Sequence, residues 1–314
     1  MTVPCAGSIG VSLVDVPLRT QDDPRARTYV IDHVEPGARF DRRLRICNGT
    51  SAPVTVTVYA GAASIDGAAF TATEGRVANE LSGWIDVVPG RVSVPPKGEQ
   101  LVDARFAVPA TATGGERYAA ILVEAPAVRQ PSGFSVANRV GVRVYLSVGG
   151  PEEPRSDFVV ESLQAERRAD GRPAITARVR NTGQRALDLR GELTLAQGPG
   201  GLSAGPFAAT VGTTLAVGAT APVEVLLDPA ISGGPWLARI AMRSGLFERR
   251  AEATITFPTE SGVASPVTAK QLPLAKDPSV VVPFAGALVG LLLLAFIVVG
   301  YLTSRRRARV RSAA

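Results

Sequence analysis

The sequence contains few residues of the kinds that carry catalysis. His33 is the only histidine among 314 residues, so a Ser-His-Asp or Cys-His arrangement would have to use it. It lies in YVIDHVEPG, at the end of an expected strand, and we interpret it as a surface histidine beside a turn. The letters GLSAG at 201–205 match a nucleophile elbow, but they lie between strand-like segments and lack the helix that this motif requires. We therefore expect no nucleophilic catalysis.

The residue patterns of metal, nucleotide and glycosidase sites are also missing from the sequence. No cluster of His, Cys and carboxylate residues has ligand spacing, and no Walker or dinucleotide glycine motif occurs. The adjacent acids Glu152 and Glu153 lie in an expected interdomain linker, where they cannot flank a sugar. The sequence thus predicts a protein that is not an enzyme and has no cofactor and no metal.

The candidates for binding centre on Trp84, in the stretch NELSGW. A buried tryptophan fills the end of a β-sandwich, whereas an exposed one can stack on the apolar face of a sugar ring. We favour the core position because tryptophan is highly buried on average. Under the sugar interpretation, Asn79, Glu80 and Ser82 supply polar groups beside the ring, and Tyr118 is a further aromatic candidate.

Strand-like alternation must position these residues, because it runs through most of the chain. The segments VTVTVY, AITARVR and EATITF each alternate apolar with polar residues, which is typical of antiparallel strands with one solvated face. Turn-forming stretches such as CNGTSAP, PPKGE and RNTGQ separate the strands. The sequence therefore predicts an all-β fold for the part that precedes the C-terminal apolar run.

An internal repeat indicates two domains. A strand, an Asn-centred turn and a second strand occur in RLRICNGTSAPVTVTVYAG and again in TARVRNTGQRALDLRGEL. Two later blocks recur in the same order, for example GGERYAAILVEA and GGPWLARIAMRS. We predict two β-sandwiches, at 8–148 and 156–258, separated by GGPEEPRSD.

An uncharged apolar run near the C-terminus predicts a membrane anchor. The segment 279–303 is long enough, at about 1.5 Å per residue, to cross a hydrocarbon core of roughly 30 Å as a helix. We expect 259–278 to be a flexible extracellular linker and 304–314 to be a basic cytoplasmic tail. The tail arginines, which set this topology by the positive-inside rule, are Arg305, Arg306, Arg307, Arg309 and Arg311.

The charge of the chain is concentrated in this tail. It supplies five of the six net positive charges, which leaves one for the rest of the chain and argues against nucleic-acid binding. The opening MTVPCAGSIGVS has neither a basic n-region nor an apolar h-region, so we expect a signal peptide to be encoded upstream of the given start. An exported domain can form disulfides, but Cys5 lies in an expected mobile terminus, so we favour two unpaired thiols, Cys5 and Cys47.

The stretch around Trp84 resembles a known family. The first half of the chain contains SIGVSLVDVP and then YVIDHVEPGARFDRRLRICNGT. These are followed, in order, by a tryptophan, the pattern VxPxxVxVPPKG, a strand that ends in proline, and GGERYAAI. This order, which covers 8–148, is similar to the peptidoglycan-binding, WxL-interacting-protein-like family of Gram-positive surface proteins (the DUF916 type). The resemblance implies Ig-like sandwiches, a C-terminal membrane span and binding of peptidoglycan by the first sandwich. The second sandwich matches only in architecture, and the arginine-rich, lysine-poor composition indicates a high-GC actinobacterium.

The sequence as a whole predicts a non-catalytic, single-pass cell-surface protein. Its first sandwich would bind peptidoglycan or another wall glycan, and its second would present a surface to a protein partner. One alternative is a scaffold or chaperone-like partner of secreted surface proteins that acts by β-strand addition, and a long edge strand without proline or lysine would favour it. Another alternative is an accessory subunit of a membrane enzyme complex.

Overall fold

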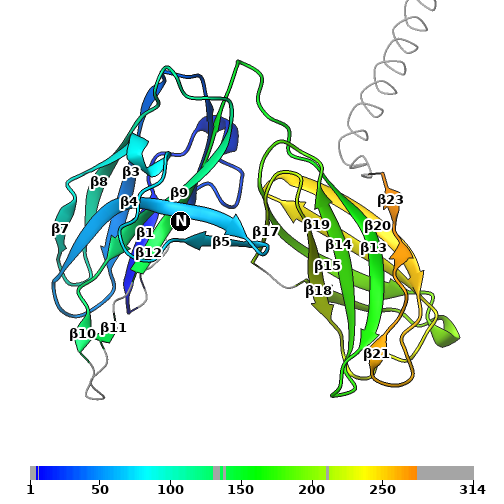
Figure 1. Ribbon diagram of the computed structural model, residues 1–314. Coiled ribbons are helices and arrows are strands. Elements are labelled where there is room, and N and C mark those ends of the chain that lie inside the picture. Colours follow the sequence, from blue (N-terminus) through cyan, green and yellow to red (C-terminus); the bar gives the residue numbers. More distant parts are fainter. Residues whose placement is uncertain (1–4, 6, 130–134, 137–138, 210–211, 274–314) are drawn as a thin grey trace, which may run out of the picture. The chain divides into compact units, whose positions relative to one another are not determined.

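The computed structural model describes residue 5 and residues 7–129, 135–136, 139–209 and 212–273. These residues form β-strands and three short 3-10 helices, and the strands assemble into two Ig-like sandwiches (Figure 1). The prediction of an all-β fold with two sandwiches is confirmed. Both sandwiches belong to one compact unit, which ends at Leu272.

The first sandwich consists of two sheets packed face to face. One has the order β1-β3-β8-β6, and the other has the order β2-β12-β9-β4-β5 with β7 also paired to β4. All pairs are antiparallel except the parallel pair of β2 with β12. The strands are β1 (Ile9–Leu13), β2 (Tyr29–Val34), β3 (Arg39–Asn48), β4 (Val54–Asp66), β5 (Ala69–Ala72), β6 (Ile85–Val88), β7 (Arg91–Val94), β8 (Glu99–Ala107), β9 (Gly115–Glu124) and β12 (Arg139–Val148). The short pair β10 (Val128–Arg129) and β11 (Ser135–Val136) and the 3-10 helices η1 (Leu18–Thr20) and η2 (Ser82–Trp84) complete it.

The second sandwich repeats this two-layer architecture. One sheet has the order β18-β14-β13-β21 with β22 also paired to β13, and the other has the order β16-β15-β19-β20-β23 with β17 paired to β15. The elements are β13 (Phe158–Arg167), β14 (Pro173–Asn181), β15 (Leu187–Ala196), η3 (Pro199–Gly201), β16 (Ala204–Ala208), β17 (Thr213–Leu215), β18 (Thr220–Leu226), β19 (Trp236–Ser244), β20 (Phe247–Ile255), β21 (Gly262–Val263), β22 (Val267–Thr268) and β23 (Lys270–Leu272).

Alternation in the sequence determines which side chains reach each core. In β4, Val56 and Val58 are buried, whereas the intervening Thr55 and Thr57 are more exposed. Burial of such aliphatic side chains stabilises the fold by about 25 cal/mol for each Å² of apolar surface removed from water.

The internal repeat is visible in the two turns that contain a central asparagine. Asn48 is buried, and its amide nitrogen donates to the carbonyl oxygens of Ala52 at 2.8 Å and Val94 at 3.1 Å. In the second sandwich the buried Asn181 donates to the Arg185 carbonyl oxygen at 2.8 Å. Because both asparagines satisfy backbone groups of the turn that follows them, they have the same structural role in the two sandwiches.

The second sandwich extends further than the sequence predicted. Residues 259–272, expected to belong to a flexible linker, contain β21, β22 and β23, which pair with β13 and β20. Gln271 anchors this segment, because its amide nitrogen donates to the Val160 carbonyl oxygen at 2.6 Å. Strands of two or three residues are too short to produce a readable alternation, so the sequence pattern missed them.

The predicted membrane anchor cannot be compared with the structure. Among the described residues, no helix is both long and apolar enough to cross a bilayer. The predicted span 279–303 and the five tail arginines lie outside these residues.

The two cysteines form a disulfide, which corrects the prediction of unpaired thiols. Cys5 is bonded to Cys47, and their Cα atoms are 6.0 Å apart. Cys5 lies against the end of β3, where Gly49 permits close approach: a Cβ atom there would be 1.9 Å from the Cys5 carbonyl oxygen. The sequence could not reveal this pairing because Cys5 precedes the first strand.

We expect Cys5→Ala to lower the free energy of unfolding by about 4 kcal/mol, because the bond closes a loop between residues separated by 42 positions. Urea denaturation of the oxidised full-length chain and the variant measures this difference. Wild type in dithiothreitol is the control and should match the variant. Equal stability of the oxidised and reduced wild type would contradict the prediction.

Candidate functional site

The richest cluster of polar side chains lies where the two sandwiches meet. Arg143 and Tyr145 project from the outer face of β12, and Asp188 projects from the outer face of β15. The Arg143 Nη1 atom lies 2.8 Å from Asp188 Oδ1, and the Tyr145 hydroxyl donates to the same oxygen at 3.3 Å. Thr214 donates to it as well, at 2.8 Å. A carboxylate of the second sandwich is thus bound mainly by donors of the first.

Arg25, from the segment between η1 and β2, contacts the other side of Asp188. Its guanidinium pairs with Asp23 at 2.8 Å, lies 3.5 Å from Asp188 Oδ2 and donates to the Ser244 hydroxyl at 3.3 Å. Burial acts to raise the pKa of Asp23, but hydrogen bonds and charge from Arg25 outweigh it and hold that pKa below its ordinary value. A Cβ atom at Gly245 would lie 2.4 Å from the side-chain ends of Asp23 and Arg25, and its φ of +58° favours glycine at this position.

Aromatic rings surround the ion pairs. The ring of Tyr145 stacks on Tyr29 at 5.6 Å between centroids and meets Phe70 at 5.3 Å and Tyr118 at 5.7 Å. The Arg143 guanidinium carbon lies 4.8 Å from the Phe70 centroid and 5.2 Å from that of Tyr29. Burial, aided by the charge of Asp188, raises the pKa of Tyr145, so its hydroxyl stays protonated and donates.

A second carboxylate links the sandwiches in the opposite direction. Glu116 of β9 accepts hydrogen bonds from the backbone nitrogen of Ala186, in the second sandwich, at 2.6 Å and from the Tyr118 hydroxyl at 2.8 Å. Burial raises the pKa of Glu116, since the charged form loses its hydration. The junction therefore holds one carboxylate from each sandwich.

An open hollow of about 280 Å³ lies beside these ion pairs. Its charged lining comes from Arg25, Arg143 and Arg190 with the single acid Asp188, and Tyr29 forms part of one wall. The remaining lining residues are Pro24, Thr28, Leu189, Gly212 and Thr213. Oδ1 of Asp188 accepts hydrogen bonds from Arg143, Tyr145 and Thr214, whereas Oδ2 has no hydrogen-bond partner in the described part of the chain and lies 3.5 Å from Arg25. The three guanidinium groups of the lining can bind an anion.

Trp84 is partly buried against the core of the first sandwich. The Arg117 guanidinium carbon lies 5.0 Å from the Trp84 ring centroid. Arg117 is itself held by Glu80 at 2.9 Å and by the Thr113 hydroxyl at 2.8 Å. Because a bound arginine covers the ring, the position fits the core interpretation better than that of a sugar platform.

Asn79 and Ser82 stabilise the turn before Trp84. The Ser82 backbone nitrogen donates to the Asn79 side chain at 2.9 Å, and the Asn79 backbone nitrogen donates to the Ser82 hydroxyl at 2.8 Å. The Asn79 amide also donates to the Tyr118 carbonyl oxygen at 2.8 Å. The structure therefore joins Glu80 to Trp84 through Arg117, but it uses Asn79 and Ser82 within the turn and directs the Tyr118 side chain to the junction.

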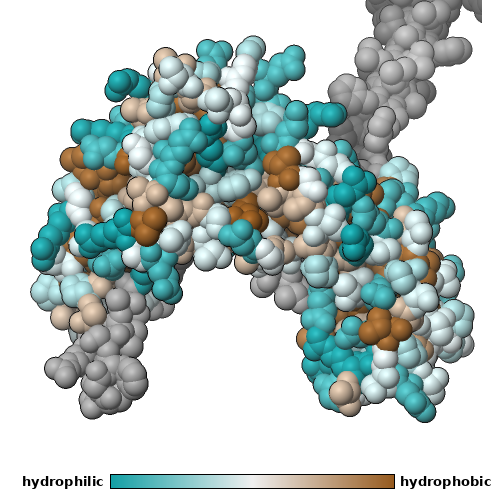
Figure 2. All heavy atoms as spheres, in the orientation of Figure 1, coloured by the Kyte–Doolittle hydropathy of each residue, from teal (hydrophilic) through white to brown (hydrophobic). Residues whose placement is uncertain are grey.

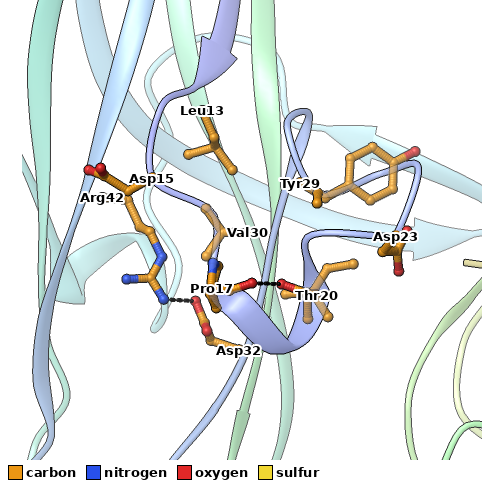
Figure 3. Close-up of a pocket in the computed structure, with 11 residues that line it drawn as sticks. Leu13, Asp15, Pro17, Thr20, Asp23, Tyr29, Val30, Asp32 and Arg42 are labelled. Carbon is orange, nitrogen blue, oxygen red and sulfur yellow. Dashed lines mark hydrogen bonds and ion pairs between the residues drawn. The ribbon is translucent and has the colours of Figure 1, made fainter. Parts of the chain in front are cut away.

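The other sequence candidates do not form a site in the described part of the chain. His33 is half-buried, and its Nε2 atom lies 2.7 Å from the Gly150 carbonyl oxygen, where the interdomain segment begins. No group of three His, Cys, Asp or Glu residues is arranged to hold a metal within the ranges that the structure covers. Figure 3 shows a small cavity beside the ion pair of Asp32 and Arg42. At about 10 Å³ it has room for roughly one water molecule.

The sequence did not reveal the junction residues, because alternation shows which face of a strand a residue occupies but not what that face contacts. The alternation in LDLRGEL places Asp188 and Arg190 on the outer face of their strand, and that in VGVRVYLS places Arg143 and Tyr145 on theirs. Charged and aromatic residues in those outward positions could have marked both faces as unusual. Nothing local says that the two faces meet.

Comparisons with known proteins give only structural matches of low identity and low TM-score. No family model matches the chain, and no curated protein matches it. Similar solved structures include the YadV chaperone, with 11% identity and a TM-score of 0.42 over 83% of this chain and 99% of that one. The structure of the SafB chaperone in complex with the Salmonella enterica SafA pilin has 12% identity and a TM-score of 0.42, over 85% of this chain and 97% of that one. The Pseudomonas aeruginosa CupB2 chaperone has 13% identity and a TM-score of 0.39 over 73% and 98%. At these identities the similarity concerns the fold alone.

We expect the stability conferred by Glu116 to depend on pH. Its pKa is raised above the ordinary 4.5 in the folded chain, so the folded state binds this proton more tightly than the unfolded state. The contribution is therefore fully present below pH 4.5 and is lost as the pH rises through the raised pKa. The difference between the melting temperature of wild type and that of Glu116→Gln should decrease as the pH rises from about 4 to about 8. Each kcal/mol of unfolding free energy that is lost corresponds to a decrease of roughly 2–4 °C.

The matched control for this measurement is Glu192→Gln, at an exposed carboxylate of β15. Its difference from wild type should stay nearly constant over the same range. A constant difference for Glu116→Gln as well would show that the folded chain does not perturb Glu116.

Proposed function

We propose that this chain is a non-catalytic protein that binds an extended segment of a partner protein by β-strand addition. The supporting observation is an unpaired edge on β12. This strand pairs with β9 from Arg139 to Val148, but it pairs with β2 only from Arg143 onward. Residues Arg139–Val142 therefore have no ladder partner on that side among the described strands. Their backbone groups can accept an added strand.

Several other edge strands, though not β1, β5 and β6, carry residues by which proteins prevent such pairing. Edge strand β18 contains Pro222, β16 contains Pro206 and β23 contains Lys270. The residues of and around η1 pack beside β2, with Pro17 and Thr20 near Val30 and Asp32 (Figure 3). The open part of β12 contains neither proline nor lysine, which is the feature expected of a strand-addition protein.

The side chains of this open stretch support backbone recognition. Val142 is fully buried in the first core, and Val140 packs against it, so neither is free to contact a partner. Gly141 faces outward, and a Cβ atom there would lie 2.8 Å from the Ile121 carbonyl oxygen. An incoming strand would therefore meet main chain rather than bulky side chains.

The surface offers no large apolar alternative on the face shown in Figure 2, where hydrophobic residues form small separate groups among polar ones. Large hydrophobic side chains with high exposure come from separate elements of both sandwiches, and they include Leu18, Leu101, Leu202, Leu246 and Val263. This scatter favours recognition by main-chain hydrogen bonds over docking on a broad apolar patch.

A second candidate function is binding of the peptidoglycan layer, which the family resemblance implies. A hollow of about 300 Å³ on the outer face of β13, β14 and β18 supports it. Its lining includes the hydroxyl side chains of Ser162, Thr176 and Thr220, none of which has a hydrogen-bond partner in the described part of the chain. Unpartnered hydroxyl groups suit a polyhydroxylated ligand such as a glycan strand. This site would place sugar binding on the second sandwich rather than at Trp84.

In either role the chain would act at the cell surface, held by the predicted membrane span. This placement rests on the sequence, through the apolar run and the arginines that follow it.

Strand addition predicts local protection of backbone amides. A peptide selected from a random display library on the full-length chain in non-ionic detergent should slow hydrogen exchange at Arg139–Val142 by at least about tenfold, or 1.4 kcal/mol. Exchange at Ile85–Val88, the edge strand of the other sheet, serves as the internal control and should not change. Protection of β6 instead, or of neither edge, would count against strand addition at β12.

Wall binding predicts that the full-length chain in detergent sediments with purified sacculi stripped of secondary polymers. The double variant Thr176→Val and Thr220→Val should reduce the pelleted fraction by about threefold or more, since each lost hydrogen bond is worth about 1 kcal/mol. Thr254→Val, at an exposed threonine of β20, is the matched control and should pellet like wild type. If wild type stays in the supernatant, the wall function is rejected while strand addition is unaffected.

A further inference from the structure

Two arginines lie directly opposite each other near the junction. Arg190 of β15 and Arg243 of β19 are register partners, so their side chains share the outer face of the sheet. Their Cβ atoms are therefore about 4.5–5.5 Å apart, a distance at which like charges destabilise a sheet. Neither arginine has an ion pair or hydrogen bond from its side chain within the described ranges.

Two of the nearby carboxylates are already engaged by other arginines. Asp188, two residues before Arg190, is engaged by Arg143 and Arg25. Glu248 faces Arg243 across the ladder of β19 with β20, but its carboxylate bonds to Arg250 at 2.7 Å. Glu192, an exposed carboxylate two residues after Arg190 on the same outward face, forms no ion pair with either arginine among the described residues. Within these residues Arg190 and Arg243 therefore lack a direct carboxylate partner.

Arg190 also lines the 280 Å³ hollow, together with Arg143 and Arg25. Its charge acts within that space. After the larger effects of burial and of Arg25, Arg190 adds to the lowering of the pKa of Asp23. The hollow thus combines an uncompensated guanidinium group, open access and a positive surround.

We propose that the outer face of the sheet beside this hollow binds a phosphate group. Its ligands are Arg190, which lines the hollow, and Arg243, which lies opposite Arg190 in the ladder, and Arg25 and Arg143 contribute positive charge from the lining. Two guanidinium forks can each donate two hydrogen bonds, and a phosphate has enough oxygens to accept from both. A carboxylate has two oxygens and one charge, so it would leave one fork unpaired. The hollow is larger than a phosphate, so the group that carries the phosphate also fits. This site is independent of strand addition and of the hydroxyl-lined hollow.

The phosphate could be free or part of a polymer of phosphodiesters, and calorimetry of the full-length chain in non-ionic detergent distinguishes them. Inorganic phosphate and poly(glycerol phosphate) are the two probes, and acetate is the carboxylate control. We expect the wild-type chain to bind phosphate more tightly than acetate. Tighter binding of the polymer per phosphate would identify a polymer as the source, whereas equal binding would identify free phosphate.

Variants assign the site to the arginine pair. Arg190→Gln and Arg243→Gln should each weaken phosphate binding at least tenfold. Both should melt at or above the temperature of wild type without phosphate, because each removes a like-charge contact. Arg239→Gln is the matched control: it lies on the same strand and face as Arg243 but is paired with Glu252 at 3.1 Å, and it should change the affinity less than twofold.

The proposal is overturned if the wild-type chain binds neither phosphate probe, or if it binds acetate as tightly as phosphate. It is also overturned if Arg239→Gln weakens binding as much as Arg190→Gln, since that result would indicate a general charge effect.

Discussion

The ion pair of Arg143 and Asp188 is the contact on which the arrangement of the junction depends. Each partner belongs to a different sandwich, and each gives up hydration when the two meet. Breaking a fully buried pair costs about 3–5 kcal/mol, because a charge is left without a partner in a poorly hydrated place. This pair keeps some exposure, so its cost is smaller. The hydroxyl groups of Thr214 and Tyr145 further offset the loss of water around Asp188.

The ion pairs and hydrogen bonds of the junction also determine what its carboxylates are able to do. Catalysis by acids and bases needs a carboxylate or an imidazole that is free to exchange a proton with a substrate. Within the described residues, Asp188 and Glu116 accept hydrogen bonds across the junction and so have structural work. The groups on which the two proposals rest are the guanidinium groups of Arg190 and Arg243 and the main-chain groups at the edge of β12. Neither kind of group is a nucleophile.

Sequence patterns predicted the part of this structure that depends on local periodicity. Alternating residues identified the strands, and the repeated asparagine turns identified two related sandwiches. The strands between 259 and 272 escaped because each has only two or three residues, and the bond of Cys5 to Cys47 escaped because one cysteine precedes every strand. The candidate site depends on contacts between faces of different sandwiches. Residues such as Arg143 and Asp188 are 45 positions apart, and no spacing rule brings them together.

The parallel pairing of β2 with β12 has a consequence for how the chain folds. Tyr29 is near the start of the first sandwich and its partner Arg143 is near the end, so this sheet cannot close until nearly the whole sandwich has been synthesised. Contacts between such distant residues make folding slow, because a long loop must be ordered before the contact forms. A chain that crosses a membrane from its N-terminus would therefore emerge with β2 unpaired. The first sandwich would then close only once β12 and the start of the segment between the two sandwiches have emerged.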